Sequence, residues 1–155
     1  LIQRILDIYG QDDLADGDTL VCNHPYEGNL PHVPDMALVT PVFHGGALVA
    51  FTASIAHKAD MGGAVPGSTW GQATELFQEG LLLPPVKIVR AGLPNADLQR
   101  LIATNSRAPE LVLVIRHGDL CRRDGPDYRR LRPAVPRGTR TPARRRIQFR
   151  RPARQ

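Results

Sequence analysis

The sequence predicts an α+β fold, in which mixed strands with a β-hairpin are flanked by helices and followed by a disordered C-terminal tail. Three observations support this prediction. Apolar residues recur at helical spacing in 1–9 and again in 95–106. Between these segments, two β-prone runs are joined by a short glycine-containing connection, which is typical of a hairpin. From residue 114 onwards Arg and Pro dominate and no hydrophobic period persists.

Residues 1–9 are expected to form the end of a helix that packs on a core. The apolar residues of this segment recur every four positions, and Gly10 can close the helix. A turn then leads to a short apolar strand over 19–22. The next segment, 23–35, contains three prolines and further turn-forming residues, so we expect no regular element there. A well-defined loop of this kind is where catalytic groups are commonly displayed.

The predicted hairpin pairs the β-prone runs 36–43 and 47–54 through the connection His44-Gly45-Gly46. His44 is expected to be a solvated turn residue. The remaining expected elements are a glycine-rich loop over 61–69, a short helix over 71–78, a strand over 86–90 and an amphipathic helix over 95–106 with Asn95 as its N-cap.

The net charge of +5 divides sharply along the chain. Residues 1–111 contain six basic and twelve acidic residues, a charge of −6, whereas 112–155 contain fourteen Arg and three Asp, a charge of +11. We therefore divide the chain into a partial domain, 1–113, and an Arg/Pro-rich tail, 114–155. The tail is expected to be disordered, because it cannot offset its ordering entropy, or to be the product of a frameshift in GC-rich DNA.

Several classes of protein are excluded by composition. The chain has no apolar run long enough for a transmembrane helix and no signal-peptide pattern. Its two cysteines, Cys22 and Cys121, give neither a disulfide framework nor zinc spacing, so a cytoplasmic protein is expected. The tail can bind polyanions non-specifically. It has few aromatic residues and no recognised module, so no specific nucleic-acid partner is expected.

Two similar tetrads carry the most specific chemistry in the chain. His32-Val33-Pro34-Asp35 and His57-Lys58-Ala59-Asp60 each place an imidazole three residues before a carboxylate. Such donors suit Zn, Fe or Mn, so His32, Asp35, His57 and Asp60 are candidate metal ligands. A single His near an Asp is more often a surface hydrogen bond or a cap. Two such tetrads in one small region, beside Gly- and Pro-rich loops, favour the metal site.

Four further residues are candidates for contact with a substrate: His24, Tyr26, Gly62 and Gly63. His24 can line a pocket together with the adjacent Tyr26, or simply cap the end of a strand. The two glycines can let the backbone approach a ligand closely, or serve turn geometry alone. No phosphate-binding loop or dinucleotide fingerprint is present.

A dense, colinear set of motifs from about Asp16 to about Leu113 resembles the hydantoinase B/oxoprolinase family. The strongest pieces are NHPY, HVPD, TPVF, AHKADMGG, PGS, ATELFQEG and PPVKIVRAG, with NSRAPELVL at the end of the match. That family includes N-methylhydantoinase B subunits, the matching half of 5-oxoprolinase and the α-type subunits of acetone carboxylase. The resemblance implies a polypeptide of several hundred residues, so we expect this chain to be a fragment.

The resemblance also implies a partner and a metal. Family members work with a hydantoinase A-type ATP-binding subunit, which would supply ATP and Mg, and several of them open a five-membered cyclic amide or imide ring. Carboxylase relatives hold a divalent metal, Mn in acetone carboxylase, through His and Asp. Carried over to this chain, His32, Asp35 and His57 are the ligands. Asp60 is a further ligand or a residue that orients His57.

One departure from the family leaves the substrate open. Many members read Asn-Asp-Pro-Tyr followed by Gly-Gly-Thr-His, whereas this chain has His24 in place of the Asp and one extra residue before His32.

Three interpretations of the function remain open: a hydrolase of a small cyclic amide, an acetone-carboxylase-like subunit acting on a ketone, and an inactive remnant with a polyanion-binding tail. The fragment alone is expected to be inactive.

Overall fold

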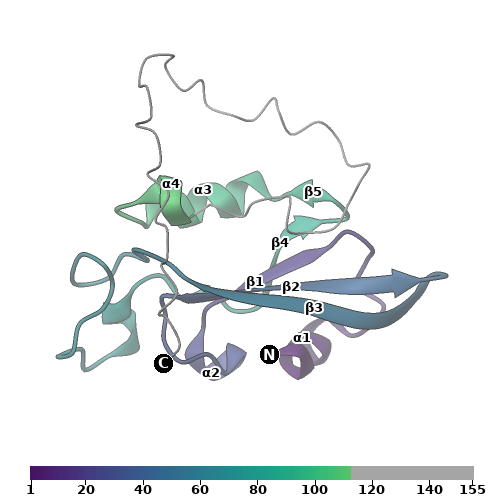
Figure 1. The fold of residues 1–155 in the computed structure, drawn as a ribbon, viewed down its shortest axis with the longest axis horizontal. Helices are drawn as coiled ribbons and strands as arrows, with labels where there is room; N and C mark the ends of the chain where they lie inside the picture. Colours follow the sequence, from purple (N-terminus) through teal and green to yellow (C-terminus); the bar gives the residue numbers. More distant parts are fainter. Residues whose placement is uncertain (113–155) are drawn as a thin grey trace, which may run out of the picture. The chain divides into compact units, whose positions relative to one another are not determined.

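The computed structural model describes residues 1–112, and within them it confirms the α+β fold (Figure 1). The predictions of a disordered or frameshifted tail and of polyanion binding fall on 114–155 and lie outside the described residues. In the described part, no helix has the length and apolar character needed to cross a membrane. The strands are β1 (Thr19–Cys22), β2 (Asp35–His44), β3 (Ala47–His57), β4 (Val86–Arg90) and β5 (Leu93–Pro94).

These strands form one antiparallel sheet in the order β3-β2-β1-β4-β5. Helices cover both of its faces (Figure 1). They are α1 (Ile2–Tyr9), α2 (Pro25–Gly28), α3 (Ala96–Thr104) and α4 (Pro109–Val112), with a short 3-10 helix, η1 (Leu76–Glu79). β1 lies in the middle of the sheet and all four of its residues are buried, which explains why its sequence is apolar without alternation.

The two faces of the sheet carry separate clusters of buried side chains. Successive residues of a strand point to opposite faces. Leu20 accordingly packs with Ile5 of α1, whereas Val21 packs with Ile102 of α3 and Val112 of α4. The prediction that the first helix packs on the core is confirmed, as is the closing role of Gly10, whose amide donates to the carbonyl of Leu6.

The β2–β3 hairpin sets the geometry of the site. Its loop, Gly45 and Gly46, has φ angles of 57° and 83°, the mirror-image turn that matches the twist of paired strands. Pairing runs from His44 opposite Ala47 to Asp35 opposite His57, with one irregularity near Phe43. The register therefore places the first residue of β2 directly beside the last residue of β3.

Three local expectations need correction. The segment 23–35 does contain a regular element, α2, because His24 caps it by accepting from the amide of Glu27 and proline occupies its first position. The short helix expected over 71–78 is reduced to η1, which a capping box formed by Glu75 begins. β3 extends three residues beyond the predicted end of its run, so His57 belongs to the strand.

Candidate metal centre

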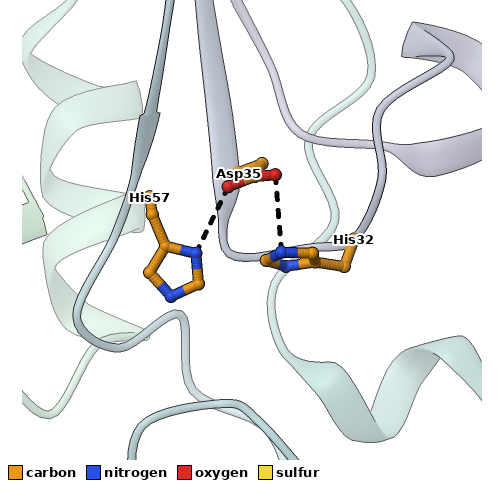
Figure 2. Close-up of side chains that lie close together, drawn as sticks. All are labelled: His32, Asp35 and His57. Carbon is orange, nitrogen blue, oxygen red and sulfur yellow. Dashed lines mark hydrogen bonds and ion pairs between the residues drawn. The ribbon is translucent and has the colours of Figure 1, made fainter.

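The structure brings His32, Asp35 and His57 together at one end of the hairpin (Figure 2). The Nε2 atom of His32 lies 3.4 Å from one oxygen of Asp35, and the Nδ1 atom of His57 lies 3.2 Å from the other. The two imidazole rings meet edge to face, with centroids 5.1 Å apart. One carboxylate therefore bridges two imidazoles supplied from segments that lie 25 positions apart in the sequence.

Backbone hydrogen bonds hold these three residues in place. The amide of Asp35 donates to the carbonyl of His32, which closes the turn between them. The amide of Lys58 donates to the carbonyl of Pro34 at 2.8 Å, so strand pairing continues just beyond the Asp35–His57 pair. The ends of β2 and β3 are thereby fixed relative to each other where the side chains converge.

Asn23 supports the same turn from inside the protein. Its fully buried amide donates to the carbonyls of Val33 and Leu81 and accepts from the amide of Leu83. Glu79 of η1 accepts from the amide of Val33 at 3.4 Å. In the sequence, Asn23 is part of the NHPY motif, and the one signal of its structural role is that a polar residue directly follows an apolar strand.

The donor set fits a divalent transition metal. Two donor atoms that each lie about 2.1 Å from one ion are separated by about 3.0 Å at a right angle and about 3.4 Å at a tetrahedral angle. The observed nitrogen–oxygen separations of 3.2 and 3.4 Å, each to a different oxygen of Asp35, fall in this range, and one ligand atom from each of the three residues lies within 4.8 Å of the other two. The side chains of His32 and His57 are 42% and 55% exposed, so the group is open on one side. Two imidazoles and a carboxylate with open positions suit Zn, Fe or Mn.

Asp60, the remaining candidate ligand, has different partners and is not a member of this group. Its carboxylate accepts from the amides of Gly62, Gly67 and Arg107 and from the Arg107 guanidinium. Burial is the largest single influence and raises the pKa of Asp60, but these hydrogen bonds together outweigh it and lower the pKa to about 2. Lys58 packs inward from the same tetrad, and its burial lowers the pKa of its ammonium group.

The four candidate substrate contacts also lie outside the group. His24 caps α2, its ring lies 6.2 Å from that of Tyr26, and Tyr26 is 84% exposed. A Cβ atom on Gly62 would lie 2.4 Å from the carbonyl oxygen of Asn105, and one on Gly63 would lie 2.4 Å from that of Gln78. Close packing of the backbone therefore accounts for both glycines without a ligand.

Arg107 is the residue of this region that sequence reasoning missed. Its guanidinium donates to the carbonyls of Gly62, Gly63 and Val65 as well as to Asp60. The signal was present, because Arg107 lies in the NSRAPELVL motif and is an isolated basic residue in an acidic part of the chain. The pattern could not say which loop, 45 positions away, the side chain would contact.

Comparison with known proteins gives consistent results. A sequence profile of the hydantoinase B/oxoprolinase family matches residues 1–119. The chain is 34% identical over 142 residues to the acetophenone carboxylase delta subunit of Aromatoleum aromaticum, an alignment that covers 83% of this chain and 20% of the relative. It is 42% identical over 82 residues to 5-oxoprolinase 1 of Arabidopsis thaliana, which covers 53% of this chain and 6% of that protein.

A solved structure extends the likeness to three dimensions. The crystal structure of ATP-dependent caprolactamase from Pseudomonas jessenii matches with a TM-score of 0.63 and 35% identity, over 69% of this chain and 18% of that one. The chain thus spans a fifth or less of the length of each of these relatives.

Proposed function

The chain belongs to the hydantoinase B/oxoprolinase family, and we propose that it carries the metal centre of an ATP-dependent enzyme that opens a small cyclic amide. The observation that supports this most directly is the convergence of His32, Asp35 and His57 on one open-sided group. Relatives named 5-oxoprolinase and caprolactamase support a cyclic amide as the substrate class. ATP and Mg would be bound by a hydantoinase A-type partner subunit.

His32, Asp35 and His57 would hold the ion. When bound there, a divalent ion would act as a Lewis acid that polarises a carbonyl group. Asp35 contributes the negative charge that makes the site attractive to a cation, and its two oxygens orient the two rings. The exposed faces of His32 and His57 leave room for a substrate amide to approach.

A carboxylase subunit is the second candidate function. It is favoured by the alignment with the acetophenone carboxylase delta subunit, which covers 83% of this chain. In that case the same three residues would serve a ketone substrate. The two candidates are separated by their co-substrate, because a carboxylase requires bicarbonate for turnover and a ring-opening hydrolase does not. Reconstitution with the ATP-binding partner, with and without bicarbonate, decides between them.

Metal content tests the proposed centre directly. The purified chain is expected to retain close to one equivalent of Mn, Zn or Fe by mass spectrometry, and the His32→Ala/His57→Ala double variant is expected to lose it. His44→Ala is the matched control, since His44 lies at the exposed end of β2 and should leave the metal content unchanged. Equal metal in the parent and the double variant, or none in either, would contradict the proposal.

A further inference from the structure

We propose that Arg107 is a positioning residue of the metal centre, which fixes His32 and His57 relative to each other through the loop of residues 60–68. This inference rests on the proposed function. It also assigns Asp60 a different role from that of a ligand, namely the anchor through which Arg107 holds the loop.

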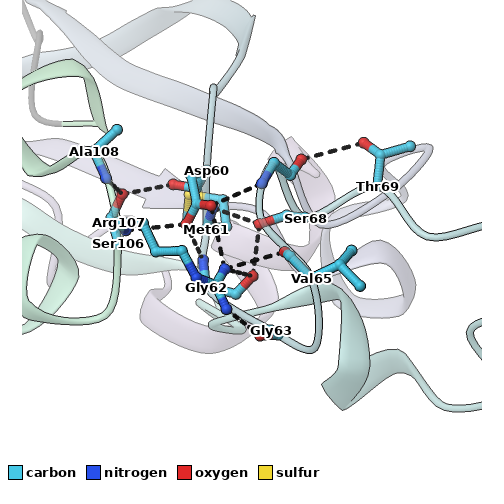
Figure 3. Close-up of polar contacts among 11 residues, drawn as sticks. Asp60, Met61, Gly62, Gly63, Val65, Ser68, Thr69, Ser106, Arg107 and Ala108 are labelled. Atoms are coloured by element: carbon cyan, nitrogen blue, oxygen red, sulfur yellow. Dashed lines mark hydrogen bonds and ion pairs between the residues drawn. The ribbon is translucent and has the colours of Figure 1, made fainter.

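Arg107 is bound to the loop from several directions (Figure 3). One guanidinium nitrogen lies 3.2 Å from an Asp60 oxygen, 3.2 Å from the carbonyl of Gly62 and 3.1 Å from that of Val65. The other lies 2.7 Å from the carbonyl of Gly63. The planar fork of arginine suits this arrangement of acceptors, which a single ammonium group cannot reproduce.

The loop is also tied to the turn after α3 through its backbone. The hydroxyl of Ser106 donates to the carbonyl of Asp60 at 2.8 Å, and the amide of Arg107 donates to its carboxylate at 3.1 Å. Gly62 packs directly on the carbonyl of Asn105, with no room for a Cβ atom. Asp60 and its neighbours therefore have one fixed position against 105–107.

This fixed loop leads to both histidines. On one side, Asp60 follows His57 by three residues, with Lys58 paired to Pro34 between them. On the other side, the loop is hydrogen-bonded to η1, because the amide of Ala64 donates to the carbonyl of Gln78. η1 is hydrogen-bonded to the segment that carries His32, because the amide of Val33 donates to the carboxylate of Glu79. Movement of the loop would thus change the separation of the two imidazoles.

The test is titration of the 155-residue chain with Mn²⁺, monitored by the electron paramagnetic resonance signal of the free ion. Arg107→Lys keeps the charge but not the fork, and is expected to weaken Mn²⁺ binding by about tenfold or more, as loss of a group that orients ligands does. Arg100→Lys, at an exposed position of α3, is the matched control and should bind like the parent. Circular dichroism establishes that each variant is folded.

Two further measurements separate positioning from general stability. Guanidinium ion at millimolar, non-denaturing concentration should restore Mn²⁺ affinity to Arg107→Ala. Asp60→Ala should weaken Mn²⁺ binding in the parent, but should cause little further loss of affinity in the Arg107→Ala variant. If Asp60 were a metal ligand, Asp60→Ala would cause the same loss of affinity in both. If the parent and Arg107→Lys bind Mn²⁺ equally well, the positioning role of Arg107 is overturned, but the proposed metal centre is not. A parent chain that binds no Mn²⁺ would overturn both.

Discussion

At the scale of single residues, Asp60 gives the protein a specific sensitivity to acid. Its pKa is lowered from 3.8 to about 2 in the folded chain. The stabilisation from this carboxylate is therefore complete above the unfolded value and is lost as the pH falls from about 4 towards 2. A shift of this size corresponds to about 2 kcal/mol.

Asp60→Asn should consequently flatten the dependence of unfolding free energy on pH between about 4 and 2, as measured by urea denaturation across that range. A residual slope is expected from Asp18. Although burial raises its pKa, hydrogen bonds from Lys87, Ala91 and Ala15 outweigh that effect and lower it. If the unfolding free energy of Asp60→Asn depends on pH as steeply as that of the parent, the hydrogen bonds of Asp60 do not stabilise its ionised carboxylate.

Alanine substitutions at two glycines distinguish the cost of an unfavourable backbone conformation from the cost of close packing. Gly45 and Gly63 both have positive φ, at 57° and 81°, but only Gly63 has backbone atoms of Gln78, Glu79 and Gly80 within 3 Å of where a Cβ would lie. Gly45→Ala should cost about 1–2 kcal/mol, the penalty for a left-handed L-residue. Gly63→Ala should cost a further 1–3 kcal/mol from overpacking. Equal unfolding free energies in urea for the two variants would contradict the close packing.

At the scale of elements, β3 is exposed along an edge of the sheet within residues 1–112. It has eleven residues and contains no Asp, Glu, Lys or Arg, while Val49 and Ile55 are each 58% exposed. A long, uncharged edge favours pairing with another chain. Thr52→Lys should therefore reduce self-association of the chain in sedimentation velocity experiments.

The matched control for β3 is Thr104→Lys, the same change at an exposed position at the end of α3. It adds the same charge to the protein without altering the edge of the sheet. If both variants reduce association equally, net charge is responsible and the edge is not. If neither variant changes association, the edge of β3 is not the surface through which copies meet.

The elements that sequence reasoning predicted best are those with a strong local signal. The Gly45-Gly46 connection predicted the hairpin, and Asn95 predicted the start of α3, where its side chain accepts from the amide of Leu98. α2 was missed because a four-residue helix that begins with a proline has almost no periodicity, and its cap, His24, is not a common capping residue.

At the scale of the whole molecule, the site depends on contacts that no local pattern encodes. The tetrads predicted His32, Asp35, His57 and Asp60 as one group, and the structure brings the first three of these residues together. The same pattern could not separate Asp60 from them, because its partner Arg107 comes from beyond β4 and α3. Spacing indicates which side chains are suitable ligands, whereas the register of β2 and β3 determines which of them meet.

The N-terminal segment is joined to the sheet by a similar long-range contact. The ammonium of Lys87 in β4 lies 2.7 Å from an oxygen of Asp18, donates to the carbonyl of Asp13 and lies 5.3 Å from the ring centre of Tyr9. The side chains of Asp18 and Lys87 are 0% and 6% exposed. Removal of one member of a buried ion pair leaves the other charge without compensation and typically costs about 3–5 kcal/mol.

Lys87→Met should therefore destabilise the chain by about 3–5 kcal/mol in urea denaturation at neutral pH. Asp18 would keep the amide donors of Ala15 and Ala91, but these do not neutralise its charge. Asp18→Asn added to Lys87→Met removes the uncompensated charge, so the double variant should be more stable than Lys87→Met alone. If the losses of unfolding free energy caused by the two substitutions are strictly additive in this double-mutant cycle, the two groups do not interact. The N-terminal segment would then be held to the sheet by apolar packing around Ile5 and Leu14.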